Sequence, residues 1–348
     1  MKAFVIDRYG SGDRVRSSEV PDPEMREDDA LIRIHAAGVN QLDSKIRDGE
    51  FKLLLPYRLP LILGNELAGV VVRVGSSVRR FKPGDEVYAR PDKTRIGTFA
   101  EFIAVGEDDL AIKPKSLTME EAASIPLVGL TAWQALIEKA KLNKGQKVLI
   151  QAGSGGVGTF AIQLAKHVGA IVATTTSTAN VDLVKRLGAD IVIDYKKDRF
   201  EEILRDCDVV LNSLDGETLK KSLRVLKPGG KLISISGPPD PEFAKYLGSS
   251  RMLELVMRLL SFRIRRQAKR HQVQYSFLFM RASGDQLRQI SSLIETGVVR
   301  PVLDRVFPFA STKEAMAYVE TGRARGKVVV RVREVPVLVS RSASSGEH

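Results

Sequence analysis

Three glycines at fixed spacing are the residues of this sequence best placed to bind a ligand. Gly153, Gly155 and Gly158 fit the pattern G-x-G-x-x-G, after an apolar run at 147–151 that predicts a strand and before a predicted helix at 158–168. This strand–loop–helix context gives the pattern its meaning. The first glycine permits a tight turn, the second lets a pyrophosphate approach the backbone, and the third lets helix and strand pack closely. We therefore predict a dinucleotide-binding loop rather than a merely glycine-rich turn.

Hydroxyl groups follow the next predicted strand, where a preference between cofactors is set. Sites that prefer NAD commonly place a carboxylate there, about 20 residues after the glycines. The segment 173–180 reads Ala-Thr-Thr-Thr-Ser-Thr-Ala-Asn and holds no carboxylate. Thr176, Ser177 and Asn180 can donate to a 2′-phosphate, and they equally suit an ordinary helix N-cap. We predict NADPH as the cofactor and weaker binding of NADH.

Cysteine and histidine are too scarce for several kinds of site. The single cysteine, Cys207, excludes a disulfide within the chain and a zinc site built from several cysteines. The four histidines are not at ligand spacing. The first residues become charged too soon for a signal peptide, and no apolar run is long enough to span a bilayer. We expect a reduced, cytoplasmic setting.

Two sequence patterns along the chain predict the elements that position these residues. Up to about residue 118, short β-rich runs are broken by Gly, Pro and Asp, which predicts a small barrel-like β domain. Beyond it, apolar strands alternate with helical segments, which predicts a parallel sheet with crossover helices. A strand at 275–279, a helix at 284–295 and a strand at 327–332 follow, and 334–348 reads as a loose tail.

Eight further motifs accompany the glycine loop in a fixed order. The motifs, each numbered at its first residue, are Gly38-Val-Asn-Gln-Leu-Asp, Gly64-Asn-Glu-Leu-Ala-Gly, Lys82-Pro-Gly-Asp-Glu, Gly97-Thr-Phe-Ala-Glu, Gly129-Leu-Thr-Ala, Leu187-Gly-Ala-Asp, Lys227-Pro-Gly-Gly and Gly326-Lys-Val-Val. Together they resemble the medium-chain dehydrogenases/reductases, in the zinc-free quinone oxidoreductase and enone reductase branch. The resemblance runs from residue 1 to about 333. It implies an α/β fold, in which a GroES-like β-barrel catalytic domain accompanies a Rossmann domain with a doubly wound parallel sheet, and a homodimer formed through the last Rossmann strand.

The resemblance also implies a split domain order. We expect the GroES-like domain at 1–123, the Rossmann NADP-binding domain at 124–281 with a basic helical insert at 241–272, a return to the catalytic domain at 282–333, and a flexible tail at 334–348.

Amide side chains stand where zinc-dependent members of the family have metal ligands. Asn40 replaces a cysteine, and Asn65 replaces the histidine of a Gly-His-Glu motif. An amide is a poor zinc ligand compared with thiolate or imidazole. We expect no metal site, and we interpret Asp43 and Glu66 as structural acceptors of loop hydrogen bonds.

The cofactor contacts implied by the resemblance fall on both sides of the glycine loop. Besides the loop glycines they are Gly156, Val157, Thr131, Leu214, Ser236, Gly237, Phe277 and Phe279, with Tyr195 on the adenine side and Lys327 on the phosphate side. Asn180 departs from the family, which often has a 2′-phosphate-binding lysine there. For the two phenylalanines, packing in the sheet core is an equally good interpretation.

The chemistry implied is hydride transfer to a quinone or an α,β-unsaturated carbonyl compound. Reduction of a conjugated acceptor leaves an enolate that needs hydrogen-bond donors. We predict Asn40 as an amide donor and Lys45 as a cationic donor or proton relay, and a solvated surface lysine is the alternative for Lys45. The substrate partner is then a small, hydrophobic electrophile.

Excess positive charge leaves a second function class open. The net charge is +12, and residues 251–270 contain seven basic side chains and one glutamate. A helix packing on the Rossmann edge or on a dimer partner is the favoured interpretation, over peripheral membrane contact, and nucleic acid is not expected. The alternative function is a non-catalytic NADPH-sensing protein that acts through this basic surface on lipid or RNA.

Overall fold

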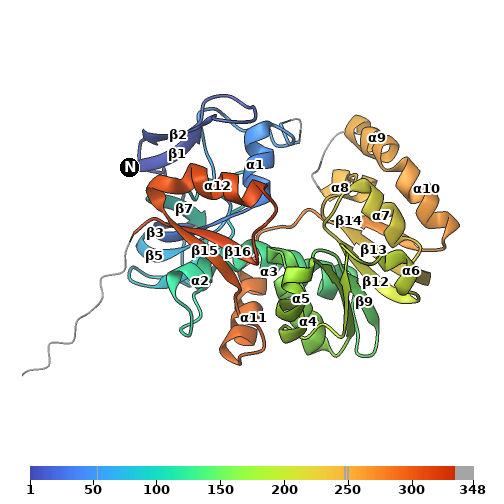
Figure 1. Cartoon of the computed structure of the whole chain (residues 1–348). Coiled ribbons are helices and arrows are strands. Elements are labelled where there is room, and N and C mark those ends of the chain that lie inside the picture. Colours follow the sequence, from blue (N-terminus) through green and yellow to red (C-terminus); the bar gives the residue numbers. More distant parts are fainter. Residues whose placement is uncertain (53, 247, 249–250, 334–348) are drawn as a thin grey trace, which may run out of the picture.

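The chain folds into two lobes joined by a central layer of helices (Figure 1). The computed structural model describes residues 1–52, 54–246, 248 and 251–333. The predicted tail at 334–348 lies outside the described residues. The expected alternation of strands and helices around a parallel sheet is confirmed.

The first lobe is built from two sheets. A small antiparallel sheet has the order β2-β1-β4 and a larger one the order β15-β16-β3-β5-β6-β8, with β7 also on β3. Their strands are β1 (Lys2–Ile6), β2 (Val15–Glu19), β3 (Asp29–Val39), β4 (Leu61–Ile62), β5 (Leu67–Val74), β6 (Glu86–Ala89), β7 (Phe102–Gly106), β8 (Leu110–Ile112), β15 (Leu303–Pro308) and β16 (Lys327–Arg331). Since β16 pairs antiparallel with β3, the C-terminal strands complete the sheet that the N-terminal strands begin.

The second lobe holds a six-stranded parallel sheet. Its strand order is β11-β10-β9-β12-β13-β14, in which the order reverses direction beside β9. The strands are β9 (Lys147–Ile150), β10 (Ile171–Thr176), β11 (Ile191–Asp194), β12 (Cys207–Asn212), β13 (Leu226–Ser234) and β14 (Gln274–Phe277). Ligands of such sheets bind at the carboxyl ends of the strands near this reversal, which here is the end of β9 and β12.

Helices cover both faces of the parallel sheet and fill the junction between the lobes. They are α1 (Gln41–Asp48), α2 (Met119–Ala123), α3 (Pro126–Trp133), α4 (Gly156–Val168), α5 (Val181–Arg186), α6 (Phe200–Ile203), α7 (Gly216–Ser222), α8 (Pro241–Tyr246), α9 (Arg251–Leu260), α10 (Phe262–Arg270), α11 (Gly284–Glu295) and α12 (Thr312–Glu320). Helix α3 begins at Pro126, because proline suits the first helical turn, and it continues as a π-helical turn over Gln134–Lys139.

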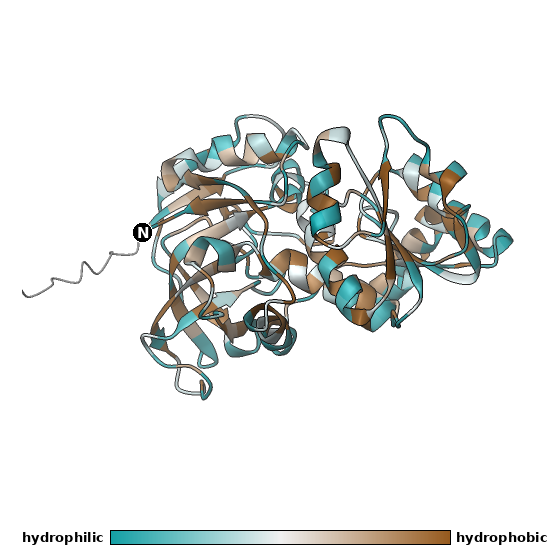
Figure 2. Cartoon of the chain, turned by 60° about the horizontal axis from the view of Figure 1, so that its bottom comes forward, coloured by the Kyte–Doolittle hydropathy of each residue, from teal (hydrophilic) through white to brown (hydrophobic). Residues whose placement is uncertain are grey.

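Residues of high hydropathy are frequent in the strands and in the helices that cover them (Figure 2). One buried cluster joins α3, α4 and the parallel sheet to residues of the first lobe such as Ala36 and Tyr88. The two lobes therefore share a continuous core along α3, which holds the carboxyl ends of the parallel strands against the first lobe.

Candidate functional site

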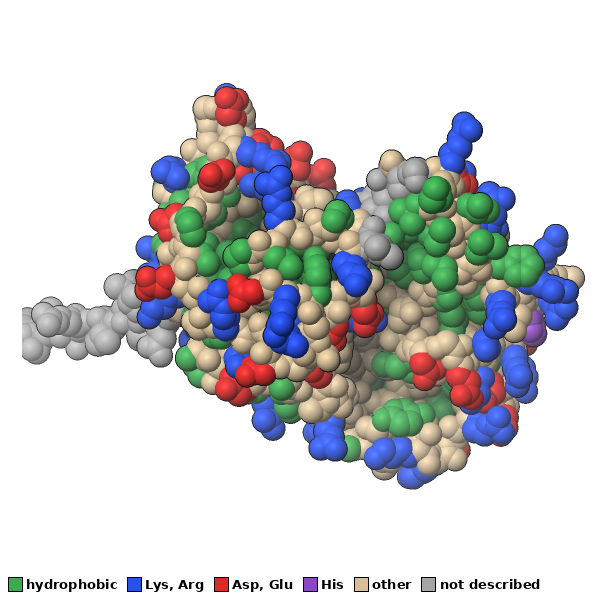
Figure 3. All heavy atoms as spheres, turned by 90° about the horizontal axis from the view of Figure 1, so that it is seen from above, with side chains coloured by type: hydrophobic (Ala, Val, Ile, Leu, Met, Phe, Trp, Pro, Cys, Tyr) green, Lys and Arg blue, Asp and Glu red, His purple; other side chains and the backbone are tan. Residues whose placement is uncertain are grey.

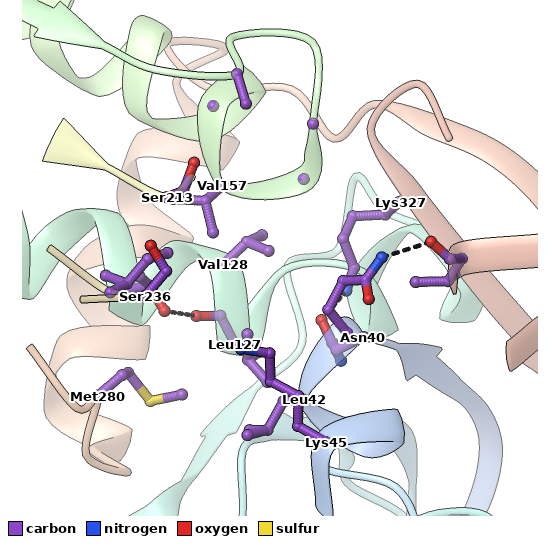
Figure 4. Close-up of a pocket in the computed structure, with 18 of the residues that line it drawn as sticks. Asn40, Leu42, Lys45, Leu127, Val128, Val157, Ser213, Ser236, Met280 and Lys327 are labelled. Atoms are coloured by element: carbon purple, nitrogen blue, oxygen red, sulfur yellow. Dashed lines mark hydrogen bonds between the residues drawn. The ribbon is translucent and has the colours of Figure 1, made fainter. Parts of the chain in front are cut away.

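A cavity of about 540 Å³ lies between the two lobes, and side chains from both line it. Figure 4 shows Ser213, Ser236 and Met280 on one side, with Asn40 and Lys327 on the other. This cavity lies at the carboxyl ends of the parallel strands, where the strand order predicts a ligand.

Twelve of the residues predicted from the sequence line this cavity. They are Asn40, Lys45, Thr131, Gly155, Gly156, Val157, Gly158, Leu214, Ser236, Phe277, Phe279 and Lys327. Gly237 lies next to the lining, and its N–H donates to Ser234 Oγ at 2.8 Å. Sequence reasoning overlooked Ser213, Met280 and Val128, which also line the cavity, because none of these residue types at these positions marks a ligand site.

The glycine loop turns from β9 into α4, and two of its glycines have no room for a side chain. A Cβ on Gly153 would overlap Thr174 Oγ1, and one on Gly158 would overlap the carbonyl oxygen of Ala152. Around Gly155 the nearest atom, Ala152 O, is 3.4 Å from such a Cβ. The backbone is therefore open at Gly155, the position where the pattern expects a pyrophosphate to approach.

Polar side chains gather around Ser154 at the end of β10. Ser154 Oγ accepts hydrogen bonds from Thr176 Oγ1 at 3.0 Å and from Asn180 Nδ2 at 3.1 Å. Asn180 Nδ2 also donates to Ser177 Oγ at 3.2 Å. The three hydroxyl and amide residues predicted to face a 2′-phosphate thus form one group outside the lining of the cavity, and Ser154 of the glycine loop belongs to it.

Asp194, the last residue of β11, and Tyr195, which follows it, complete this region. Asp194 is the register partner of Thr176 on the neighbouring strand, and its Oδ2 accepts a hydrogen bond from Thr178 at 2.6 Å. This hydrogen bond holds the pKa of Asp194 below its usual value. Tyr195, predicted on the adenine side, is 60% exposed. The linear sequence did not reveal Asp194, because the carboxylate comes from the third strand rather than the second.

A buried cluster of charged and amide side chains forms the wall of the cavity next to α1. Glu66 is fully buried, and its Oε1 accepts from Lys327 Nζ at 2.6 Å and from Asn40 Nδ2 at 2.8 Å. Lys327 Nζ also donates to Asn40 Oδ1 at 2.5 Å and to Val39 O at 3.3 Å. Each end of the Asn40 amide is therefore already bonded within the protein.

Lys327 contacts the glycine loop by its stem and the buried carboxylate by its head. Its Cδ would lie 2.8 Å from a Cβ built on Gly156, so only glycine fits there without displacement. Its ammonium group points to Glu66 and Asn40. The contact of Lys327 with cofactor phosphates stays a prediction.

Asp43 extends the cluster away from the cavity. Its Oδ1 accepts from Asn65 Nδ2 and its Oδ2 from the backbone N–H of Asn40, both at 2.7 Å. Complete burial raises the pKa of Asp43 to about 7, although both hydrogen bonds oppose the shift. The pair of bonds fixes the start of α1, from which Lys45 projects.

Lys45 is the cationic lining residue with most access to solvent. Its side chain is 42% exposed, and its Nζ lies 3.6 Å from Glu50 Oε2. Figure 4 shows Lys45 near Leu42, on the α1 side of the cavity. Because its one ion pair is long and exposed, the ammonium group can turn toward a ligand at little cost.

Aromatic rings form another part of the wall of the cavity. The ring centroids of Phe279 lie 5.9 Å from Phe51 and 5.2 Å from Phe243, and Phe243 lies 5.2 Å from Phe277. Phe51, Phe277 and Phe279 line the cavity, and Phe243 packs behind them. This wall suits a flat, apolar ligand.

At the position where zinc-dependent members of the family have metal ligands, this chain has residues of a different chemistry. Asn40 and Asn65 offer amides, and the ammonium group of Lys327 occupies the acceptors of Asn40 and Glu66. No three His, Cys, Asp or Glu side chains gather as metal ligands within the described part of the chain. This donor set does not fit Zn²⁺, which prefers thiolate and imidazole.

Two family models match the chain. Residues 26–115 match an alcohol dehydrogenase GroES-like domain, and residues 187–330 match a zinc-binding dehydrogenase. Among curated relatives, the mitochondrial NAD(P)H oxidoreductase RTN4IP1 of Danio rerio is 37% identical over 96% of this chain and 92% of its own length. The chloroplastic NADPH-dependent alkenal/one oxidoreductase of Arabidopsis thaliana is 37% identical over 95% of this chain and 79% of its own.

A solved structure shows the same architecture. The quinone oxidoreductase from Coxiella burnetii superposes with a TM-score of 0.83, at 30% identity, and the match covers 96% of this chain and 99% of that one. The expectation of a GroES-like domain beside a Rossmann-type parallel sheet is thereby confirmed.

Proposed function

This chain belongs to the medium-chain dehydrogenase/reductase superfamily, in its quinone and enone oxidoreductase branch, and from that premise we propose that it reduces quinones or α,β-unsaturated carbonyl compounds with NADPH. One observation carries the proposal: the glycine loop and an aromatic wall face the same cavity between the lobes. The non-catalytic alternative is not retained, because the relatives reported above are named as oxidoreductases.

The residues divide the work of binding and reaction. A bound nicotinamide supplies the hydride, and the open backbone at Gly155 with the N-terminus of α4 receives its pyrophosphate. Thr131, Leu214 and Ser236, which line the cavity, would hold the nicotinamide end of the cofactor. The aromatic wall excludes water from the substrate and orients its plane.

Lys45 is our candidate for the donor that stabilises developing charge on the substrate oxygen. The hydrogen-bonding groups of Asn40 are held by Glu66 and Lys327, so its direct donation would break buried bonds. We assign Asn40 a positioning role: it holds the start of α1 and the buried pair of Glu66 and Lys327 in place. The Lys45 ammonium can then donate to an enolate oxygen or pass on a proton from water.

NADPH preference rests on the group around Ser154. Thr176, Ser177 and Asn180 supply donors there, and the nearest carboxylate on the adjoining strand, Asp194, is occupied by Thr178. Hydrogen bonds to a phosphate are charge-assisted and contribute roughly 1.5–3 kcal/mol each. We expect NADPH to bind about tenfold more tightly than NADH, as a titration of each cofactor will measure.

Activity without zinc is part of the same proposal. The ammonium of Lys327 takes the acceptors that a metal ion would need, and amides replace the soft ligands. We expect the pure protein to contain no stoichiometric zinc and to keep its full rate after chelator treatment, as elemental analysis and assay will check. One zinc per chain, with activity lost on its removal, would contradict this.

A panel assay tests the reaction class. NADPH oxidation is followed with a benzoquinone, a naphthoquinone, an enal and an enone, beside a saturated ketone as control. We expect turnover of at least one conjugated acceptor and none of the saturated ketone, since the residues around Asn40 and Glu66 do not suit a Lewis-acid metal that would polarise it. Comparable rates on both kinds of substrate would overturn the assignment.

Assembly and location complete the proposal. We propose a homodimer, supported by β14, which is the outer strand of the parallel sheet. No helix in the described part of the chain is long and apolar enough to cross a membrane. We propose a cytoplasmic location, although two relatives bear the names mitochondrial and chloroplastic. Sedimentation analysis and cell fractionation test the two points.

A further inference from the structure

Helix α9 carries apolar side chains on two faces, and only one of these faces packs against the rest of the described chain. Met257 is 1% exposed, and with Leu253 it packs on Phe243 and Phe277 behind the cavity. The remaining apolar residues recur every three or four positions on the outward side. They are Met252 (76% exposed), Leu255 (55%), Val256 (43%) and Leu259 (67%), joined by Leu260 (58%) and Phe262 (53%) at the junction with α10.

This outward face is unlike the rest of the described surface. Elsewhere in the described chain no two exposed large apolar residues are neighbours in the sequence, as Ile112, Ile171 and Ile203 illustrate. Scattered residues of that kind are ordinary, whereas a contiguous patch marks an interaction site. Packing of α9 on the Rossmann edge, one part of the favoured interpretation of 251–270, therefore holds within the single chain for Leu253 and Met257, whereas packing on a dimer partner stays a prediction.

Basic side chains border the apolar face. The exposed members of α9 and α10 are Arg251, Arg258, Arg263, Arg265, Arg266, Lys269 and Arg270. Within the described residues, a salt bridge is seen for Arg258 alone, with Glu254 at 3.4 Å. Figure 3 shows the apolar patch at the upper right, with blue side chains around it. The face is thus apolar at its centre and cationic at its edge.

We propose that the outward face of α9 and the start of α10 dock on the surface of an anionic lipid bilayer. An interfacial helix buries its apolar side chains among the acyl chains while arginines at its border reach the lipid phosphates. A second copy of the chain fits less well, because a twofold contact would bring two cationic borders together. RNA fits less well too, because its phosphates would pair with the arginines but would leave the apolar centre of the face exposed to water.

Docking by this face has a geometric consequence. The inward side of α9 packs on Phe277 of the aromatic wall and on Phe243 behind it, so docking would bring this wall near the lipid. A helix with its side chains is about 10 Å across. Apolar molecules dissolved in the bilayer would therefore lie close to the cavity, whichever substrate the enzyme uses.

Vesicle flotation with the full chain tests the proposal. The probes are vesicles of phosphatidylcholine alone and of an equimolar mixture with phosphatidylglycerol, at low and high salt. We expect the protein to float with the anionic vesicles, weakly or not at all with the neutral ones, and less at high salt. Leu255→Ser with Leu259→Ser, and separately Arg263, Arg265 and Arg266 to Gln, should each lower binding about tenfold or more.

Matched variants remove the same chemistry from other surfaces. Ile171→Ser with Ile203→Ser controls for exposed apolar area, and Lys82, Lys115 and Lys220 to Gln controls for net charge. Unchanged NADPH oxidation and circular dichroism will show that each variant is folded. Absence of binding to anionic vesicles, or equal losses in test and control variants, would refute the proposal. It is equally refuted if the Leu255/Leu259 variant turns a dimer into a monomer, or if RNA binding alone depends on the arginines.

Discussion

At the scale of single residues, one lysine takes part in two environments. The Lys327 side chain runs along the glycine loop, and its ammonium group neutralises the buried Glu66 beside Asn40. Removing one partner of such a buried pair leaves an uncompensated charge, which commonly costs about 3–5 kcal/mol. The cluster therefore fixes α1 and the first lobe in one arrangement, and it leaves Lys45 as the adjustable cation of the cavity.

Substitution of Lys45 tests its role as a donor. Lys45→Met should lower kcat on an active enone or quinone about tenfold or more, with little change in the Kd of NADPH, because the donor acts on the reacting oxygen. Steady-state rates and a cofactor titration measure the two effects. Lys52→Met, an exposed lysine just beyond α1, is the control and should leave both unchanged.

Asn40→Ala should behave differently from Lys45→Met. It removes both partners that Asn40 offers to Glu66 and Lys327, so we expect the free energy of unfolding to fall by roughly 1–3 kcal/mol besides any loss of rate. Denaturant titration measures it. A lower kcat with an unchanged free energy of unfolding would instead indicate that the Asn40 amide donates directly to the substrate oxygen.

Asp43 makes stability depend on pH in an unusual direction. Its folded pKa of about 7 lies above the usual value of an aspartate, so between about pH 4 and 7 the folded state holds a proton that the unfolded state has lost. Its contribution to stability is complete below about pH 4 and is lost as the pH rises to about 7. Asp43→Asn should flatten this slope, whatever its effect on absolute stability, as denaturation midpoints across the range will show.

At the scale of elements, the end of β10 and the start of α5 set cofactor preference. Asn180 stands at the start of α5 and reaches back to Ser154 in the glycine loop. One side chain thus connects the strand end, the loop and the helix.

Asn180→Lys should strengthen NADPH binding relative to NADH. An ammonium group at this position meets the 2′-phosphate, and one charge-assisted hydrogen bond corresponds to about tenfold in affinity. Fluorescence titration of both cofactors gives the ratio. Asn143→Lys, an exposed site before β9, adds the same charge elsewhere and should leave the ratio as it was. An equal gain for NADH would show that general attraction, and not the phosphate contact, is responsible.

Periodicity and glycine spacing predicted the elements of the second lobe well, because buried parallel strands read as apolar runs. The direction of a side chain was harder to predict. Lys327 points into the first lobe because β16 pairs with β3 in one register, and a linear sequence does not contain that register. For α9, the sequence shows two apolar faces, and only tertiary packing decides which one is covered. Short helices such as α1 and α12 lack the length that makes periodicity visible.

At the scale of the whole molecule, the strand that returns to the first lobe also holds the glycine loop. The N–H of Gly326 donates to Ser154 O at 2.8 Å, and Gly326 forms a bridge with Gly155. Gly326 has φ +87°, and a Cβ there would overlap Val302 O. The segment that leads into β16 is therefore bonded directly to the glycine loop.

Gly326→Ala should weaken both stability and NADPH binding. The strained backbone and the collision with Val302 O together cost roughly 1–3 kcal/mol. Gly322→Ala is the matched control, since Gly322 also has a positive φ of +67° but no atom lies within 4 Å of its added Cβ. Equal midpoints and equal cofactor affinities in the two variants would rule out a role for this junction.

The pairing of β16 with β3 has a consequence for synthesis on the ribosome. Glu66 and Lys327 are 261 residues apart, so the carboxylate leaves the exit tunnel long before its partner cation is translated. Until then the second half of β3 has a free edge, which favours pairing with other nascent chains. The first lobe can reach its final form only when almost the whole polypeptide has emerged. Chains that stop before residue 327 are therefore expected to be recognised by chaperones as unfinished, even with every strand of the parallel sheet already made.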